Sequence, residues 1–186
     1  MSRLREYLTE DGNMDVIETI KRDCKPFLYE SDGLLYRGVE QNIKHILKKT
    51  ARLTDRKPMN MDKELHELFN ALFIERFGWP VRNGVFAVGD SIHAYRWPGC
   101  DSPYIFFPIG RYKYVWSRSV KDLYIEYDDS DWDDKRSLEQ KQSVVDQYID
   151  TNLDEARHMG RHEISFKCNE YYLINMIYEN DLKRLL

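Results

Sequence analysis

One stretch of the chain repeats apolar side chains at the spacing of an amphipathic helix. Residues 62–77 place them three and four positions apart, which lines them up along one side of a helix. Asp62 predicts an N-terminal cap, and Gly78 with Pro80 predicts the helix end. The predicted stripe consists of Leu65, Leu68, Phe69, Leu72, Phe73 and Phe77.

Short apolar runs bounded by turn residues predict strands on both sides of this helix. The first run follows an Asp32-Gly33 turn, and Pro108 predicts the end of a strand or an edge strand. Asn169-Glu170 predicts a hairpin turn between the last two strands. The predicted strands are 34–38, 84–89, 104–109, 163–168 and 171–177. Residues 112–116 and 121–127 add strand, or a short helix at the corner from Ser117 to Asp122.

Two further segments have helical patterns. Residues 3–22 predict two short helices, the second capped near Asn13 and ended by Lys25-Pro26, and residues 137–150 predict another helix. Helices come first and strands dominate later, so we expect the α+β class, with N-terminal helices packed on a mixed, largely antiparallel sheet. The length predicts a single domain over 1–186, with an N-terminal helical segment over 1–30.

The composition, charge and motif content of the chain argue against a membrane protein, a metal site and general attraction to nucleic acid. Apolar residues make up 42% and charged residues 32%, and no run of 18 apolar residues occurs, so we expect no membrane span. The polar start of the chain predicts an intracellular, cytoplasmic protein, in the host cell if it is a phage-encoded effector. No CxxC, HxH or HExxH spacing occurs, so no metal is expected. A net charge of −4 gives no overall attraction to nucleic acid.

Two charged stretches allow two interpretations each. Residues 128–134 are strongly acidic and form either a solvated loop or a surface that binds a basic partner. Residues 52–58 are basic and form either a solvated loop, with a local Asp55–Arg56 pair, or a contact to an acidic target or to adenosine phosphates.

An arginine on an early strand and a glutamate on a late one are the strongest candidates for chemistry. Arg37 suits a diphosphate because its planar fork donates several hydrogen bonds and stays charged, and Gly38 beside it lets a ligand approach the backbone. The alternative is a local pair between Arg37 and Glu40. Glu163 opens a strand and has cationic neighbours that favour its ionised form, although a leading glutamate can also be simply solvated.

These segments resemble those of ADP-ribosyltransferases. The resemblance rests on Tyr36-Arg37-Gly38, on a central strand followed by a helix, and on the late strand that begins Glu163-Ile164 and continues to Tyr171-Tyr172. It implies that NAD is the substrate, that Arg37 holds its phosphate and ribose, and that Glu163 stabilises an oxocarbenium-like transition state. The family's Ser-Thr-Ser strand would correspond to 86–89, which contains no serine, and the nearest serine is Ser91.

Aromatic side chains complete the predicted site. Phe86, Tyr95 and Trp97 are candidates for stacking on nicotinamide. A core position is the simpler interpretation of Phe86, and Tyr95, on the helix expected after the central strand, is the better candidate. Arg161, two residues before the glutamate, cannot deprotonate an acceptor, which disfavours an arginine target and favours a nucleic-acid base or a small nucleophile. The resemblance thus implies transfer of ADP-ribose to an intracellular protein or nucleic acid, with no membrane and no metal involved. The alternatives are a non-catalytic acidic binding or inhibitor protein and a component of a larger assembly.

Overall fold

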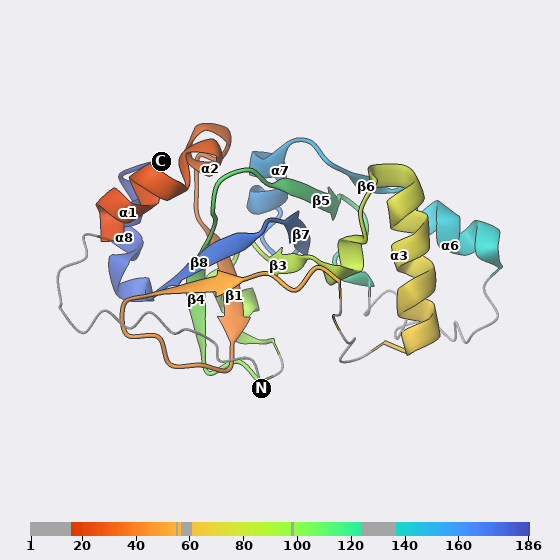
Figure 1. The fold of residues 1–186 in the computed structure, drawn as a ribbon, viewed down its shortest axis with the longest axis horizontal. Helices are drawn as coiled ribbons and strands as arrows, with labels where there is room; N and C mark the ends of the chain where they lie inside the picture. Colours follow the sequence, from red (N-terminus) through yellow and green to blue (C-terminus); the bar gives the residue numbers. More distant parts are fainter. Residues whose placement is uncertain (1–15, 55, 57–60, 98, 124–136) are drawn as a thin grey trace.

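The described part of the protein contains two antiparallel sheets of four strands each. The structure is a computed structural model that describes residues 16–54, 56, 61–97, 99–123 and 137–186. Its mixture of helices and antiparallel sheets confirms the predicted α+β class (Figure 1). The first sheet has the order β1 (Leu35–Val39), β4 (Ser102–Pro108), β8 (Glu170–Ile174) and β2 (Ile46–Thr50). The second has the order β3 (Val85–Ala87), β7 (Ile164–Lys167), β5 (Lys113–Ser117) and β6 (Tyr148–Ile149).

The two sheets meet where their edge strands β1 and β3 come together. The Tyr36 N–H donates to the Val88 carbonyl at 2.8 Å, and the Val88 N–H donates back to Tyr36 at 2.9 Å. Inside the molecule, the Phe106 ring of β4 lies 5.0 Å, centre to centre, from the Phe166 ring of β7. We call this meeting line the seam, and the candidate site lies along it.

The predicted hairpin between the last two strands is wrong. β7 pairs with β3 and β5, whereas β8 pairs with β4 and β2, so the chain passes from one sheet to the other at Cys168–Asn169. The carbonyl of Asn169 accepts from the Ala51 N–H at 2.9 Å, which ties the crossing to the end of β2. A turn residue between two apolar runs indicates where a strand stops, but it does not fix which strand the next run pairs with.

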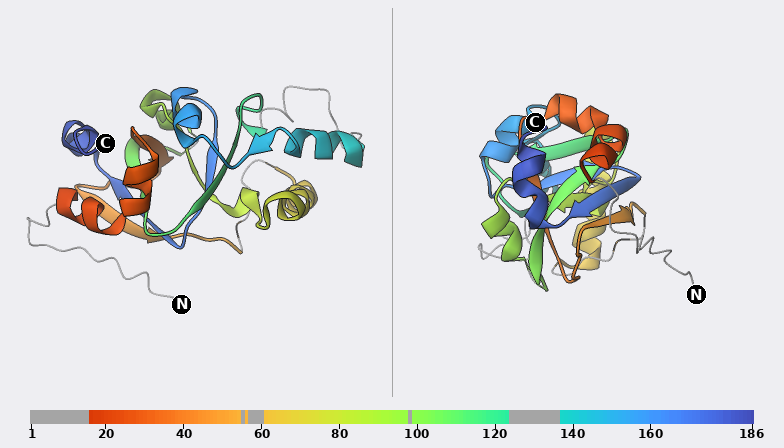
Figure 2. Two further views of the ribbon diagram at one scale, coloured as in Figure 1. Left: turned by 90° about the horizontal axis from the view of Figure 1, so that it is seen from above. Right: turned by 90° about the vertical axis from the view of Figure 1, so that its left-hand side faces the viewer.

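Helices cover both ends of the sheets. α1 (Val16–Asp23), α2 (Lys25–Glu30) and α8 (Glu179–Lys183) lie at one end, and α3 (Lys63–Phe77) and α6 (Leu138–Val145) lie at the other, as the views of Figure 2 confirm. α1 ends before Lys25-Pro26 as predicted, but Pro26 then lies in the first turn of α2, where no intrahelical N–H is needed. The predicted cap near Asn13 lies outside the described residues.

The predicted helix over 62–77 is confirmed, together with both of its ends. The Asp62 carboxylate accepts from the backbone N–H of Glu64 at 2.7 Å, and Gly78 ends α3 in the left-handed conformation with φ 74°. The helix predicted over 137–150 is too long, because it stops at Val145 and the chain then forms β6 against β5. Tyr148 and Ile149 are residue types that favour strands.

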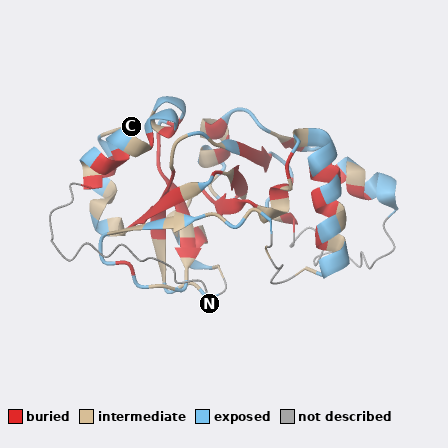
Figure 3. Ribbon diagram, in the orientation of Figure 1, coloured by how far each residue is buried: buried red, intermediate tan, exposed pale blue. Residues whose placement is uncertain are grey.

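The buried side chains form two cores that share β5. Tyr114 and Trp116 point into the larger core between the sheets, while Val115 between them packs with Phe73 of α3 in the smaller one. A strand that is buried on both faces loses the apolar–polar alternation of a half-exposed strand. Figure 3 shows the buried positions concentrated on the central strands and along one side of α3.

No helix in the described part of the chain is long and apolar enough to span a membrane. Within the same residues, no group of three or more His, Cys, Asp or Glu side chains is placed to hold a metal ion.

Candidate functional site

Arg37 lies on the seam, because it follows the residue that bridges the two sheets. Its Nη1 atom donates to the carbonyl of Phe86 on β3. Its guanidinium carbon lies 5.7 Å from the ring centre of Trp97, which is close enough for a cation–π contact. These contacts, rather than the considered pair with Glu40, hold the Arg37 side chain. It therefore spans from the first sheet to the second.

Glu163 is the last residue before β7, the strand beside β3. Its backbone N–H donates to the carbonyl of Lys121 at 2.8 Å. Its carboxylate accepts from Nη1 of Arg82 at 3.3 Å, in a pair whose side chains are only 18% and 13% exposed. Glu163 is thus a partly buried, partnered carboxyl rather than a solvated one.

Arg37 and Glu163 are connected through Phe86 and Arg82, because Arg37 donates to the Phe86 carbonyl while Arg82 lies against the Phe86 ring and donates to Glu163. Burial lowers the pKa of Arg37, and the Glu163 carboxylate acts in the opposite direction. Burial, followed by the negative charge of Asp122, raises the pKa of Glu163 to about 7, although Arg82 and Arg56 oppose that change. Near neutral pH the Glu163 carboxyl is therefore divided between its neutral and ionised forms.

This pKa predicts how the stability of the protein depends on pH. Glu163 has an ordinary pKa of 4.5 in the unfolded chain and one of about 7 in the fold, so the fold holds the proton more tightly. Between these pH values stability falls as pH rises, by up to about 3 kcal/mol from this group. Glu163→Gln lacks that loss. In urea unfolding, the free energy of unfolding of Glu163→Gln relative to that of the wild type is therefore expected to rise by up to that amount between pH 5 and pH 8.

The difference between the two proteins isolates Glu163 from the other titrating groups. Burial lowers the pKa of His66, His93 and His162, which makes stability rise with pH in both proteins alike. Parallel stability curves for wild type and Glu163→Gln would show that the Glu163 carboxyl is ionised at pH 5.

Phe86 is buried beneath two further arginines. The guanidinium carbon of Arg56 lies 4.4 Å from the ring centre and that of Arg82 lies 4.8 Å from it. The ring is only 6% exposed, and Arg56 also donates to the carbonyl of Gly84. In this arrangement Phe86 supports guanidinium groups, so stacking on a nicotinamide ring would need one of them to move.

The other predicted site residues lie on or beside α4 (Ser91–Tyr95). A Cβ atom at Gly38 would lie 2.3 Å from the Ala94 carbonyl oxygen, so the missing side chain lets α4 pack closely against β1. Gly38 therefore faces α4 and not an open space for a ligand. Ser91 is the first residue of α4, after the capping Asp90. Tyr95 is 57% exposed, which leaves its ring accessible at the surface.

The serine next to Phe86 comes from a different strand from the one expected. β3 contains no serine, but Ser165 of β7 pairs with Phe86 across the ladder. Its hydroxyl is buried and donates to the carbonyl of Val81 at 2.6 Å. Ser165 therefore fixes η1 (Val81–Asn83), the short helix that carries Arg82.

The sequence pattern did not indicate the contact of Arg82 with Glu163. For Arg56 it left open a solvated loop with a local Asp55–Arg56 pair, or a contact of residues 52–58 with an acidic target or with adenosine phosphates. In the sequence Arg82 stands between Pro80 and Gly84, a pattern that indicates a loop and says nothing of where the Arg82 side chain points. Comparison with models of protein families, with curated proteins and with solved structures finds no match. The acidic stretch 128–134 lies outside the described residues.

Proposed function

We propose that the protein is an ADP-ribosyltransferase-like enzyme that transfers ADP-ribose from NAD to a macromolecule inside the cell. The observation that carries the proposal is that Arg37 and Glu163 are linked through Phe86 and Arg82. Arg37 donates to the Phe86 carbonyl, and Arg82, which lies against the Phe86 ring, donates to the Glu163 carboxylate. An arginine for the diphosphate and a carboxylate for the developing ribosyl cation are the two charges that this reaction needs.

The side chains at the seam are suited to NAD as a substrate. The Nε atoms of Arg37 and Arg82 are buried and have no hydrogen-bond partner among the described residues. A buried donor without a partner is costly, and the oxygens of a diphosphate accept from such donors. Tyr95, with its exposed ring on α4, is available for contact with a nicotinamide or adenine ring, and Ser91 lies on the same helix.

The proposed reaction breaks the bond between C1 of the ribose and the nicotinamide nitrogen. The bonding electron pair leaves with nicotinamide, which becomes neutral, and positive charge develops on the ribose. The ionised Glu163 carboxylate stabilises that charge, and Arg82 at 3.3 Å favours the ionised form. A nucleophile of the target then forms the new bond to C1 and loses its proton to solvent.

Transfer of label tests this proposal directly. Cell lysate is incubated at pH 8 with the protein and with NAD labelled in its adenylate phosphate, and macromolecules are then collected. We expect label to enter them with wild-type protein but not with Glu163→Gln. Digestion with protease or with nuclease then shows whether the acceptor is protein or nucleic acid. Label entering equally with both proteins, or with neither, would contradict the proposal.

A non-catalytic binding or inhibitor protein is the second candidate. It is favoured by the two guanidinium groups on Phe86 and by the absence of a serine from β3, since both differ from what the resemblance implies. In that case the protein would neither bind NAD nor transfer label.

A further inference from the structure

Three arginines from separate parts of the chain meet at the seam. Arg37 comes from β1, Arg56 from the segment after β2, and Arg82 from η1. Arg56 and Arg82 lie against the ring of Phe86, and Arg37 donates to the carbonyl of the same residue. We call these three side chains the arginine cluster.

Among the described residues, the arginine cluster holds more positive charge than the carboxyls that act on it neutralise. Against the three guanidinium groups stand two carboxyls. Glu163 accepts a hydrogen bond from Arg82, and the charge of Asp122 acts on Glu163. Burial, and then the charges of Arg37 and Arg82, lower the pKa of Arg56 to about 10. Like charges held together in a partly buried place destabilise one another unless an anion joins them.

The cluster also has hydrogen-bond donors to spare. Arg37 and Arg56 each use one Nη1 atom on a backbone carbonyl, those of Phe86 and Gly84 respectively. The Nε atoms of Arg37 and Arg82 are buried with no partner in the described part of the chain. A guanidinium presents five N–H donors in a planar fork that matches two oxygens of a phosphate.

We infer that the arginine cluster is a binding site for a diphosphate group, with Arg56 and Arg82 acting beside Arg37. A diphosphate supplies about two negative charges and several acceptor oxygens, which suits more than one guanidinium at a time. The inference deepens the proposed function and rests on it for the source of the diphosphate, namely a dinucleotide. The binding itself requires no bond to break.

Titration calorimetry with inorganic pyrophosphate, in metal-free buffer at pH 7.5 and low salt, tests the inference. Wild type is expected to bind pyrophosphate more tightly than orthophosphate. Arg56→Gln is expected to weaken pyrophosphate binding by about tenfold or more, because a charge-assisted hydrogen bond is lost. Arg56→Lys keeps the positive charge without the planar fork of donors, so its affinity for pyrophosphate is expected to lie between those of wild type and Arg56→Gln.

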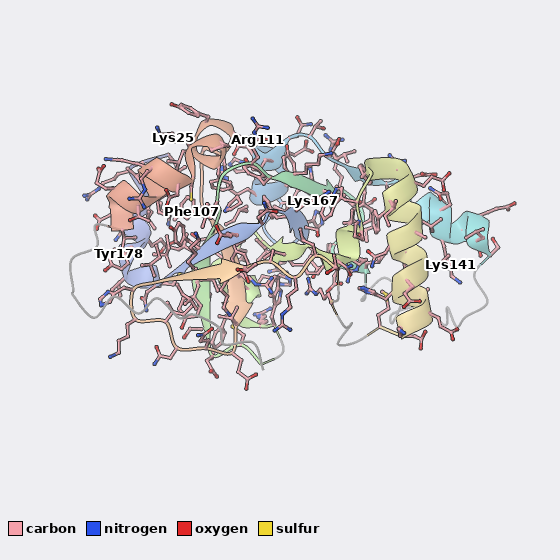
Figure 4. The ribbon with its side chains drawn as sticks, in the orientation of Figure 1. Lys25, Phe107, Arg111, Lys141, Lys167 and Tyr178 are labelled. Atoms are coloured by element: carbon pink, nitrogen blue, oxygen red, sulfur yellow. The ribbon has the colours of Figure 1, made fainter. Side chains whose placement is uncertain are left out.

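Arg111→Gln is the matched control, since it removes the same charge elsewhere. Arg111 is exposed at the turn after β4 and is labelled in Figure 4. Its loss is expected to change pyrophosphate affinity by less than about twofold, as for a distant, screened charge. Equal losses in Arg56→Gln and Arg111→Gln would overturn the inference in favour of general charge attraction. No binding by a wild-type protein whose thermal melt shows it folded would overturn it as well.

The inference and the proposed function fail in distinguishable ways. A protein that binds pyrophosphate through Arg56 but releases no nicotinamide from NAD keeps the diphosphate site and loses the transferase. A protein that releases nicotinamide, and whose reaction is unaffected by pyrophosphate and by Arg56→Gln, keeps the transferase and loses the arginine cluster as its diphosphate site.

Discussion

Glu163→Gln is expected to slow nicotinamide release from NAD by about 10³-fold, the order seen when one group that stabilises transition-state charge is lost. The amide has nearly the same shape as the carboxyl but carries no negative charge for the ribosyl cation. The dissociation constant of NAD is expected to change little, because the carboxylate acts mainly in the transition state. Single-turnover release at pH 8 and equilibrium NAD binding, measured on the same samples, check both parts.

A matched variant separates charge from general damage at this position. Glu163→Asp keeps a carboxylate one methylene farther from the substrate and is expected to retain more activity than Glu163→Gln. Since Gln resembles the neutral form of Glu163, which the fold favours below pH 7, the inactive variant is expected to be the more stable protein at pH 8. Equal activity of wild type and Glu163→Gln would exclude Glu163 as the catalytic carboxylate.

Phe106→Ala is expected to lower the free energy of unfolding by about 3–5 kcal/mol, the cost of a large cavity in a packed core. Phe106 is fully buried and lies 5.0 Å from Phe166 of the second sheet and 5.5 Å from Tyr171 of its own, centre to centre. The cavity would therefore open where the sheets pack together, beneath the seam. Urea unfolding followed by circular dichroism measures the loss.

Tyr29→Ala is the control for that substitution. Tyr29 is 89% exposed on α2, so its removal is expected to change stability by less than about 0.5 kcal/mol. A loss of under about 1 kcal/mol for Phe106→Ala would contradict the close packing between the sheets, because the smallest Phe-to-Ala losses in well-packed cores are several times larger.

Local chemistry made some elements predictable. The α3 helix begins at its Asp62 cap and ends at Gly78 because both ends are encoded in adjacent residues. The first strand was predicted to within one residue of β1, and Arg37 lies within it. Because the elements could be predicted locally, their order along the chain was enough to predict the α+β class.

Long-range pairing was not predictable from the same signals. The apolar runs that form β7 and β8 are separated by two residues, as in a hairpin, yet each pairs with strands distant in sequence. β2, with the half-polar sequence Ile46-Leu47-Lys48-Lys49-Thr50, was missed because it lies at the edge of its sheet and carries two lysines.

The composition of the candidate site was predictable only in part. Arg37 and Glu163 could be proposed from the sequence because one lies in a predicted strand and the other at the start of one, each with a recognisable pattern around it. Arg82 lies on the short helix η1, and its contact with Glu163 depends on how η1 packs against β7, where the Ser165 hydroxyl donates to the Val81 carbonyl. Such contacts between distant segments leave no periodic trace in one sequence.

The central claim is that Arg37 and Glu163 serve one NAD site, and nicotinamide release tests it most directly. Wild type, Arg37→Gln and Glu163→Gln are compared at pH 8 with NAD and cell lysate, and NAD binding is measured on each. The account predicts release by wild type, loss of NAD binding in Arg37→Gln, and loss of release with binding kept in Glu163→Gln. No release and no NAD binding by folded wild-type protein would contradict it and would favour a binding protein instead.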